Sequence, residues 1–374
     1  MFSNKQCKEV LKKVVLDFAK EAIANAGKNS INFDELRAGK ANIKVFGVGG
    51  AGCNSVTWLF NKGISGATVY GVNTDALHLS ITKADEKVLI GKELTRGLGA
   101  GGKPKVGMEA AKESVSELKR ATGGADMVFI VTGLGGGTGT GASPIIAQLA
   151  KESGAVVIAV ATMPFDCEKV RQDKAEFGLQ ELTEVVDTAI LIDNNRLVDI
   201  AGNLPMEQAF AVANELISTM IKGIVETITL PSLINLDYAD VSAIMKNGDV
   251  AVIGVGEADT QDRVGEAVRQ ALTQPLLDVD YRGATGALVH ITCGPDFKLE
   301  EFAGVGELVT ENISNDAQVI IGARINKDFA NKVRVITIMT GVKSPYILGR
   351  EAFRKEEKGG MKPEMSDLGI EVFR

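Results

Sequence analysis

The most informative stretch of this sequence reads Gly133-Leu134-Gly135-Gly136-Gly137-Thr138-Gly139-Thr140-Gly141. It follows a strand pattern at 126–131 and precedes a helical pattern that Ser143 and Pro144 are expected to open, as N-cap and first-turn proline. Six glycines in nine residues would destabilise a regular helix or strand by about 0.5–1 kcal/mol each. Glycines instead let a backbone approach phosphate closely, at a helix N-terminus that presents unpaired amides. The stretch therefore predicts a phosphate-binding loop, with Thr138 and Thr140 adding hydroxyl donors.

A second glycine loop, Gly47-Val48-Gly49-Gly50-Ala51-Gly52, lies between a β-rich run at 43–47 and a helical pattern at 54–61. Alone, this G-x-G-x-x-G motif would favour a dinucleotide-binding Rossmann domain. That domain needs an acidic residue about 20 residues on, at the tip of the next strand. The next strand pattern runs into Asn73-Thr74-Asp75, so the acid comes later than the motif expects. A dinucleotide-dependent oxidoreductase therefore remains an alternative.

A third glycine loop, Arg96–Pro104, nearly matches the P-loop, since Gly97 is followed at the expected distance by Gly102 and Lys103. Position 104 is proline, however, so the hydroxyl that would bind Mg²⁺ is missing. The segment also follows a turn-rich stretch rather than a clear strand. We reject a P-loop enzyme and expect a flexible loop that orders around a terminal phosphate.

Composition restricts the other classes of function. The chain of 374 residues carries a formal net charge of -7, which argues against general nucleic-acid binding. Its four cysteines are scattered, without a C-x-x-C pair or a histidine cluster, so we expect reduced thiols and no metal site formed by protein ligands. The two histidines, His78 and His290, are taken as structural. No apolar run is long enough for a membrane span, so a cytoplasmic protein without direct membrane insertion is expected.

The order of patterns predicts an α/β protein with distinct parts. Residues 1–40 form an amphipathic helical extension, and 41–228 form a parallel-sheet nucleotide-binding domain that ends in a long helix over 206–228. Residues 229–343 form a smaller α/β domain, and 344–374 a linker with a short apolar tip at Leu368–Phe373. Such a tip is the expected form of a docking peptide, although a frayed terminus explains it equally well.

The three loops together resemble those of the FtsZ family of tubulin-like GTPases, and the long N-terminal helix resembles archaeal members. The family signature G-G-G-T-G-[ST]-G is present as Gly135–Gly141, and the resemblance covers about 42–342. It implies a Rossmann-like GTPase domain, a long central helix and a smaller α/β domain, with GTP or GDP as the ligand and Mg²⁺ held mainly through the phosphates.

The resemblance also implies roles for individual residues. Glu168 matches the family's ribose-contacting acid, Phe210 matches the aromatic residue that stacks on the base, and Asn194 and Asn214 match positions near guanine and ribose. Arg171 matches less well, because the family spaces its Glu and Arg four apart and here they are three apart. The complete predicted nucleotide set is Gly49, Gly50, Ala51, Gly52, Cys53, Asn54, Asn73, Asp75, Ala100, Gly101, Gly102, Gly136, Gly137, Thr138, Gly139, Thr140, Glu168, Arg171, Asn194, Phe210 and Asn214.

The expected hydrolytic element is Asn235-Leu236-Asp237-Tyr238-Ala239-Asp240, which matches the family's N-x-D-[FY]-A-D loop. Asn235, Asp237 and Asp240 are its candidate catalytic residues. Asp237 and Asp240 are three apart, so on a helical turn both carboxylates share one side and can position a water. The alternative is that they only cap a helix. In the resembling fold this loop lies at the opposite pole from the nucleotide, so a second subunit completes the active site through a head-to-tail contact.

The sequence therefore predicts a self-assembling GTPase that forms filaments in cell division at mid-cell. Its partners would be further copies of itself and a membrane-adaptor protein bound by the C-terminal tail, with no nucleic acid. Besides the oxidoreductase, a nucleotide-binding scaffold without hydrolysis is the remaining alternative.

Overall fold

The computed structural model describes residues 41–230, 234, 237–246, 249–273, 284–311, 313–314 and 316–342. The expected N-terminal helix, the C-terminal linker and tail, and Asn235 of the acidic loop lie outside the described residues. The pattern of contacts within the chain divides it into two units, Met1–Lys40 and Ala41–Arg374. All of the described elements belong to the second unit.

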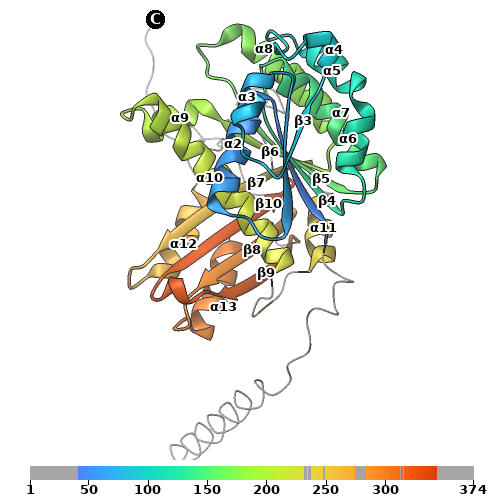
Figure 1. Ribbon diagram of the computed structural model, residues 1–374. Helices are drawn as coiled ribbons and strands as arrows, with labels where there is room; N and C mark the ends of the chain where they lie inside the picture. Colours follow the sequence, from blue (N-terminus) through green and yellow to red (C-terminus); the bar gives the residue numbers. More distant parts are fainter. Residues whose placement is uncertain are drawn as a thin grey trace, which may run out of the picture. The chain divides into compact units, whose positions relative to one another are not determined.

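The described strands form one mixed sheet in the order β3-β2-β1-β4-β5-β6-β7-β10-β8-β9 (Figure 1). The strands are β1 (Ile43–Val48), β2 (Ala67–Asn73), β3 (Glu86–Leu89), β4 (Met127–Gly133), β5 (Val156–Met163), β6 (Thr188–Asp193), β7 (Asp249–Ala258), β8 (Gly286–Cys293), β9 (Gln318–Ile325) and β10 (Val333–Thr340). β1 to β6 pair in parallel, as the alternation of strands and helices predicted. β7 extends the sheet beside β6 in parallel, and β10 then pairs antiparallel with both β7 and β8.

Helices cover both faces of the parallel part of the sheet (Figure 1). The described helices are α2 (Gly49–Lys62), α3 (Ala76–Ile81), α4 (Lys92–Thr95), α5 (Pro104–Glu113), α6 (Val115–Thr122), α7 (Thr138–Glu152), α8 (Lys169–Thr183), α9 (Asn194–Ala201), α10 (Met206–Thr229), α11 (Tyr238–Lys246), α12 (Arg263–Leu272), α13 (Leu299–Thr310) and the 3₁₀ turn η2 (Lys327–Phe329). Successive strand residues point to opposite faces, so the buried β1 sends Phe46 toward the core under α5–α8 and Val45 toward the core under α2 and α10.

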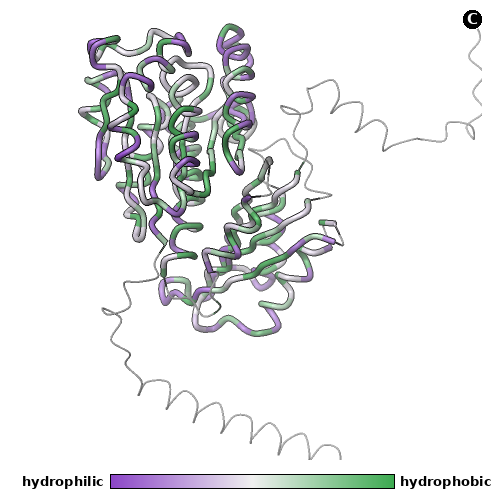
Figure 2. Tube along the Cα trace, turned by 90° about the vertical axis from the view of Figure 1, so that its right-hand side faces the viewer, coloured by the Kyte–Doolittle hydropathy of each residue, from purple (hydrophilic) through white to green (hydrophobic). Residues whose placement is uncertain are grey.

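The central helix α10 matches the long pattern predicted over 206–228. Its Ile221 and Ile224 belong to a core that contains Val45 of β1 and also Leu288 of β8 and Ile336 of β10. The same helix therefore packs against strands from both halves of the chain. A third core lies among β7–β10, α12 and α13. Figure 2 shows hydrophobic and hydrophilic positions alternating along the helices, as expected where one side is buried.

Polar contacts add to this junction between α10 and the second half of the chain. Glu226 of α10 accepts a hydrogen bond of 3.1 Å from Arg324 of β9. Nearby, burial and the Arg324 charge lower the pKa of His290 on β8 to about 4. His290 is therefore neutral at neutral pH and belongs to the interior of the sheet, in agreement with the structural role expected for it.

The start of α7 differs from the prediction. Ser143 and Pro144 were expected to open this helix, but it begins at Thr138, with Gly137 as its N-cap and Pro144 inside it. Two of the signature glycines, Gly139 and Gly141, thus lie inside the first helical turns, while Gly135–Gly137 form the turn between β4 and the helix. Close packing accounts for this, because a Cβ at Gly141 would overlap the carbonyl oxygen of Pro104 on α5. Only glycine allows α7 to approach α5 this closely.

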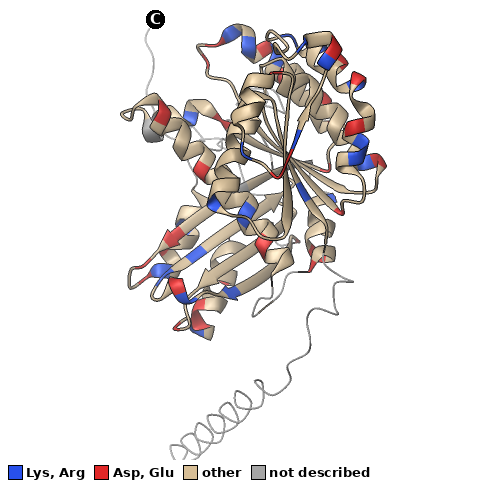
Figure 3. Ribbon diagram, viewed as in Figure 1, with Lys and Arg blue, Asp and Glu red and all other residues tan. Residues whose placement is uncertain are grey.

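Acidic and basic side chains are interspersed over the outer helices in the view of Figure 3. Across the part of the chain that the structure describes, no helix is both long and apolar enough to cross a bilayer.

Candidate functional site

A cavity of about 1120 Å³ lies where the carboxyl ends of β4 and β5 meet the N-terminal parts of α2 and α10. This edge of a parallel sheet is where ligands bind in open α/β folds. Twelve residues of the predicted nucleotide set line the cavity: Gly50, Ala51, Asn54, Gly136, Gly137, Thr138, Gly139, Glu168, Arg171, Asn194, Phe210 and Asn214. The structure thus brings together residues that lie up to 164 positions apart in the sequence, since Gly50 and Asn214 both line the cavity.

The first two glycine loops contact each other at the floor of this cavity. Gly49 has a φ of 73°, and a Cβ there would lie 2.8 Å from the amide nitrogen of Gly139. A Cβ at Gly52 would overlap the carbonyl oxygen of Val131 in β4. Both glycines are therefore required by backbone packing, and this packing aligns the N-termini of α2 and α7 on one site. Two helix N-termini supply backbone amides suited to an anion.

The third glycine loop supports the signature loop from outside. A Cβ at Gly137 would lie 2.8 Å from the Cβ of Ala100, and the ammonium of Lys174 on α8 donates to the carbonyl oxygen of Gly102 at 2.7 Å. Ala100, Gly101 and Gly102 themselves do not line the cavity, and Gly101 and Gly102 are exposed. Their predicted contact with a terminal phosphate stays a prediction.

Another part of the cavity lining combines aromatic and amide side chains. The rings of Phe165 and Phe210 lie 6.0 Å apart in an edge-on arrangement. Asn194 opens α9, and Asn214 on α10 accepts a hydrogen bond of 2.8 Å from the hydroxyl of Ser55 on α2. An aromatic face beside oriented amides suits a purine base.

Glu168 and Arg171 meet on the rim of the cavity. The Arg171 guanidinium donates to the Glu168 carboxylate at 2.6 Å, and both side chains line the cavity. The spacing of three residues, shorter than the family's four, therefore still brings the two side chains together, because Glu168 is the N-cap residue of α8 and Arg171 lies in its first turn.

Four further residues of the predicted set do not line the cavity and instead organise the loops around it. The buried thiol of Cys53 donates to Gly47 and Val72, and burial raises its pKa to about 11. Thr140 accepts from the amide of Gly135 at 2.9 Å, inside the signature loop. Asp75 caps α3, and Asn73 accepts from the amides that follow it. The contact with nucleotide that the sequence predicts for these four residues, and for Gly49 and Gly52, stays a prediction.

Several cavity residues were missed from the sequence. Thr162, Pro164 and Phe165 follow β5 or lie at its end, and the rule that ligands lie at the carboxyl ends of parallel strands could have found them. His78 also lines the cavity, although it was expected to be structural. The other missed residues are Ser55, Thr57, Trp58, Gly133, Leu134, Glu207, Gln208, Ala211, Ala213 and Ile217.

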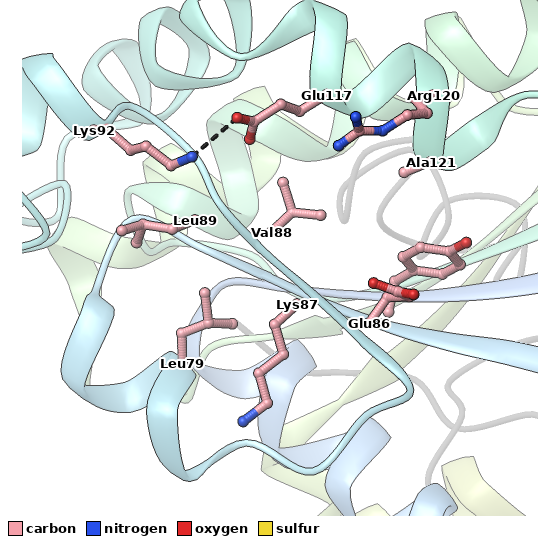
Figure 4. Close-up of a pocket in the computed structure, with 10 residues that line it drawn as sticks. Leu79, Glu86, Lys87, Val88, Leu89, Lys92, Glu117, Arg120 and Ala121 are labelled. Atoms are coloured by element: carbon pink, nitrogen blue, oxygen red, sulfur yellow. Dashed lines mark hydrogen bonds and ion pairs between the residues drawn. The ribbon is translucent and has the colours of Figure 1, made fainter.

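A smaller hollow of about 490 Å³ lies between α6 and the β2–β3 edge of the sheet (Figure 4). Figure 4 shows Lys92 of α4 reaching Glu117 of α6, in an ion pair of 2.9 Å. None of the three glycine loops contributes to this lining. The nucleotide is therefore assigned to the larger cavity.

The candidate hydrolytic loop lies at the opposite end of the sheet. Asp237 accepts a hydrogen bond of 2.9 Å from the amide of Asp240, so it caps the first turn of α11. The Tyr238 hydroxyl donates to the carbonyl oxygen of Asp126, the residue before β4, at 2.7 Å. The cavity lies beyond Gly133 at the other end of this strand, and seven strand residues span about 20 Å. Asp240 therefore cannot reach the cavity of its own chain.

Glycine loops at the carboxyl edge of a parallel sheet, with a long helix joining it to a second α/β region, define a tubulin-like nucleotide-binding protein. A family model for the GTPase domain of the Tubulin/FtsZ family matches residues 42–202, and one for the C-terminal domain of the FtsZ family matches residues 249–343. The chain belongs to the FtsZ family of tubulin-like GTPases, and it is accordingly a guanine-nucleotide-binding enzyme.

Individual relatives agree with this assignment. The chain is 49% identical to "Cell division protein FtsZ 2" of Methanocaldococcus jannaschii over 91% of this chain and 90% of that protein. It is 53% identical to "Cell division protein FtsZ 1" of Pyrococcus furiosus over 83% of this chain and 84% of that protein. A solved "FtsZ dimer, empty" from M. jannaschii superimposes with a TM-score of 0.78 at 50% identity, covering 83% of this chain and 90% of that one. Because the chain belongs to this family of GTPases, the alternative of a dinucleotide-dependent oxidoreductase is excluded.

Proposed function

We propose that this GTPase assembles head-to-tail into filaments for cell division and hydrolyses GTP where two subunits meet. The observation that carries the proposal is the placement of Asp240 and the cavity at opposite ends of the same strand, β4. A second copy stacked along this axis would bring its Asp240 to the first copy's nucleotide. Such a contact joins two different surfaces, so it repeats into an open filament. The named dimer of the M. jannaschii relative supports self-association.

Within this proposal, the residues of the cavity bind and orient the nucleotide. Backbone amides of Gly50–Asn54 and Gly136–Gly139 receive the phosphates, with Gly101 and Gly102 nearest the terminal one. Phe210 faces the base and Glu168 the ribose, while Asp237, Asp240 and Asn235 of the next subunit position the attacking water. Residues 41–228 thus form the nucleotide-binding domain, and 229–343 carry the activating loop.

Mg²⁺ would be held mainly through phosphate oxygens. Among the described residues no group of three or more His, Cys, Asp or Glu side chains could hold a metal ion, and hydroxyl and backbone groups dominate the phosphate end of the cavity. This set of donors fits a cation most of whose ligands are phosphate oxygens and water molecules. When bound, Mg²⁺ would neutralise charge on the transferred phosphoryl group.

The proposal predicts that phosphate release per molecule rises with protein concentration above a threshold. The rise follows because assembly completes the site. The measurement is phosphate release from GTP across protein concentrations, with sedimentation in parallel and ATP as the control nucleotide. A specific rate that stays flat, with no GTP-dependent pelleting, would instead favour the non-hydrolysing scaffold or hydrolysis within one chain.

The C-terminal tail is proposed to recruit a membrane adaptor and so to place the filament at the mid-cell division site. The apolar tip Leu368–Phe373 at the end of a polar segment motivates this. Deleting residues 360–374 should leave polymerisation intact and abolish binding to adaptor-coated vesicles, measured by co-sedimentation. Unchanged vesicle binding of the truncated protein would show that the adaptor is recruited elsewhere.

A further inference from the structure

The side-chain amide of Asn195 joins two segments that follow neighbouring strands of the sheet. Asn195 lies in the first turn of α9, directly after the cavity residue Asn194, and does not itself line the cavity. Its oxygen accepts from the backbone amide of Asp166 at 2.8 Å, and its nitrogen donates to the carboxylate of the same residue at 3.2 Å. The nitrogen also donates to the Asp193 carboxylate at 2.8 Å. Asp193 ends β6 and Asp166 follows β5, and these two strands pair in parallel.

The three hydrogen bonds fix the direction of the Asn195 amide. Its oxygen faces a backbone N–H, while its nitrogen faces the carboxylates of Asp166 and Asp193, which accept hydrogen bonds and donate none when they are ionised. A flipped amide would lose all three bonds. The amide nitrogen therefore lies between two acidic side chains and gives each of them a donor. An aspartate at this position would keep the shape of the side chain but would place a third carboxylate against the other two.

The loop that Asn195 holds forms part of the cavity wall. This loop runs from the end of β5 to the start of α8, and its Phe165 and Glu168 line the cavity. The Asp166 carboxylate between them also accepts from Gln172 on α8 at 2.6 Å. The loop is thus tied to α8 through Gln172 and to α9 through Asn195, and both ties meet at one exposed residue. Removing the tie to α9 should let the loop leave the wall.

We infer that Asn195 is a positioning residue for nucleotide binding, which holds Phe165 and Glu168 in the cavity wall through Asp166. The inference rests on the proposed function, since it assumes that the cavity holds GTP or GDP. A loop that occupies other positions lowers the apparent affinity in proportion to the fraction of molecules that can bind. The loss should not require the phosphates, because Glu168 is proposed to face the ribose and Phe165 packs edge-on against Phe210.

The test compares the binding of GDP and of guanosine, which lacks phosphates, to three variants. These are Asn195→Ala, Asn195→Asp and the double variant Asn195→Asp with Asp166→Asn. The double variant exchanges the amide and the carboxylate, so that an amide at position 166 can donate to a carboxylate at position 195. Asp173→Asn is the control, because Asp173 is exposed on α8 and does not line the cavity. The single tryptophan of the chain, Trp58, lines the cavity, so its fluorescence can report binding.

Asn195→Ala should weaken the binding of GDP and of guanosine by about ten-fold, the size expected for lost hydrogen bonds to charged groups. Asn195→Asp should weaken both by about 30-fold, because its carboxylate repels those of Asp166 and Asp193. A role in packing alone predicts the opposite order, since aspartate fills the space of asparagine and alanine does not. The double variant should bind more tightly than Asn195→Asp, because one hydrogen bond between the two positions returns, and Asp173→Asn should match the wild type.

The inference is overturned if Asn195→Asp binds as tightly as Asn195→Ala, or if the double variant binds no better than Asn195→Asp. A loss for GDP alone would also overturn it, because the added charge would then be repelling the phosphates directly. If circular dichroism shows that Asn195→Asp does not fold, Asn195→Ala decides, and unchanged GDP affinity in that variant overturns the inference. Failure of the wild-type protein to bind GDP or GTP would overturn the proposed function, and the inference with it.

Discussion

Replacing Asp240 with alanine should slow GTP turnover by about 10²–10⁴-fold while nucleotide binding and filament assembly persist. Asp240 lies in the first turn of α11, where its carboxylate is partly exposed at the pole of the sheet opposite the cavity. Its loss removes no described contact of the core. Phosphate release and sedimentation, measured on the same samples at saturating GTP, separate turnover from assembly.

Asp240→Asn is the matched control for the fold, because it keeps the size of the side chain and the Asp237 cap and removes only the charge; it should lose turnover as Asp240→Ala does. Asp237→Ala is a companion variant and not a control, because Asp237 is itself a proposed catalytic residue and its loss as a cap also costs about 1 kcal/mol of helix stability. Turnover in Asp240→Ala that equals the wild-type rate would mean that the acidic loop only caps the helix, which is the alternative that the sequence left open.

A mixing experiment tests whether the site is shared between two chains. Gly50 lines the cavity, and a Cβ there meets no atom within 4 Å, so Gly50→Tyr should block the phosphate end without disturbing the fold. Neither Gly50→Tyr nor Asp240→Ala should turn over GTP alone. In an equimolar random filament about a quarter of the junctions pair an intact cavity with an intact loop, so activity should reappear on mixing. Co-sedimentation of the two variants without recovered activity would place the whole site in one chain.

The sequence predicted the order of elements well where patterns are local. The pattern over 206–228 has few helix breakers, and α10 ends within one residue of it. Two of the glycine-rich segments were placed correctly between a strand and a helix, after β1 and after β4, while their contact with phosphate stays a prediction. The starts of α2 and α7 were placed about five residues late, since glycine was treated as a helix breaker. Packing of Gly49 on Gly139 and of Gly141 on Pro104 overrides that propensity.

The parts that local patterns did not reveal depend on contacts across the fold. His78 and Asn54 are 24 residues apart, and no periodicity indicates that an imidazole on α3 meets an amide on α2. The parallel pairing of Thr188 with Asp249, which joins the two halves of the sheet, is likewise a long-range register. The Phe165 ring beside Phe210 was missed because it follows β5 in a segment without a motif.

Replacing Arg263 with methionine should lower the free energy of unfolding by about 2 kcal/mol, between the cost of losing an exposed pair and that of breaking a fully buried one, because the arginine is buried while the side chains of Asp296 and Glu301 are 38% and 22% exposed. Arg263 on α12 is 9% exposed. Its guanidinium donates to Glu301 of α13 at 2.7 and 2.9 Å and to Asp296 at 2.6 Å. Methionine keeps much of the apolar stem but leaves two carboxylates without their cation. Urea unfolding followed by circular dichroism measures the loss.

The matched control is Arg334→Met, because Arg334 makes an ion pair with Glu257 at 2.6 Å but is 31% exposed in its side chain. An exposed pair contributes at most about 1 kcal/mol, so this variant should unfold close to the wild type. Equal losses in the two variants would mean that burial does not decide the strength of the Arg263 pairs.

The pH dependence of the Arg263→Met effect follows from its two carboxylate partners. Hydrogen bonds from Arg263 hold the pKa of Asp296 and of Glu301 below their ordinary values. A carboxyl group whose pKa is lowered by folding stabilises the protein fully above its unfolded pKa, and it loses that contribution as the pH falls through the folded value. The difference between wild type and Arg263→Met should therefore be constant near neutral pH and shrink below about pH 4.5, where Glu begins to take up protons in the unfolded chain. About pH 3 lies below the unfolded pKa of both carboxyl groups. If the difference in unfolding free energy stays constant down to that pH, the arginine acts through packing and not through its charge. The packing partner would then be Phe297, whose ring centre lies 5.9 Å from the guanidinium.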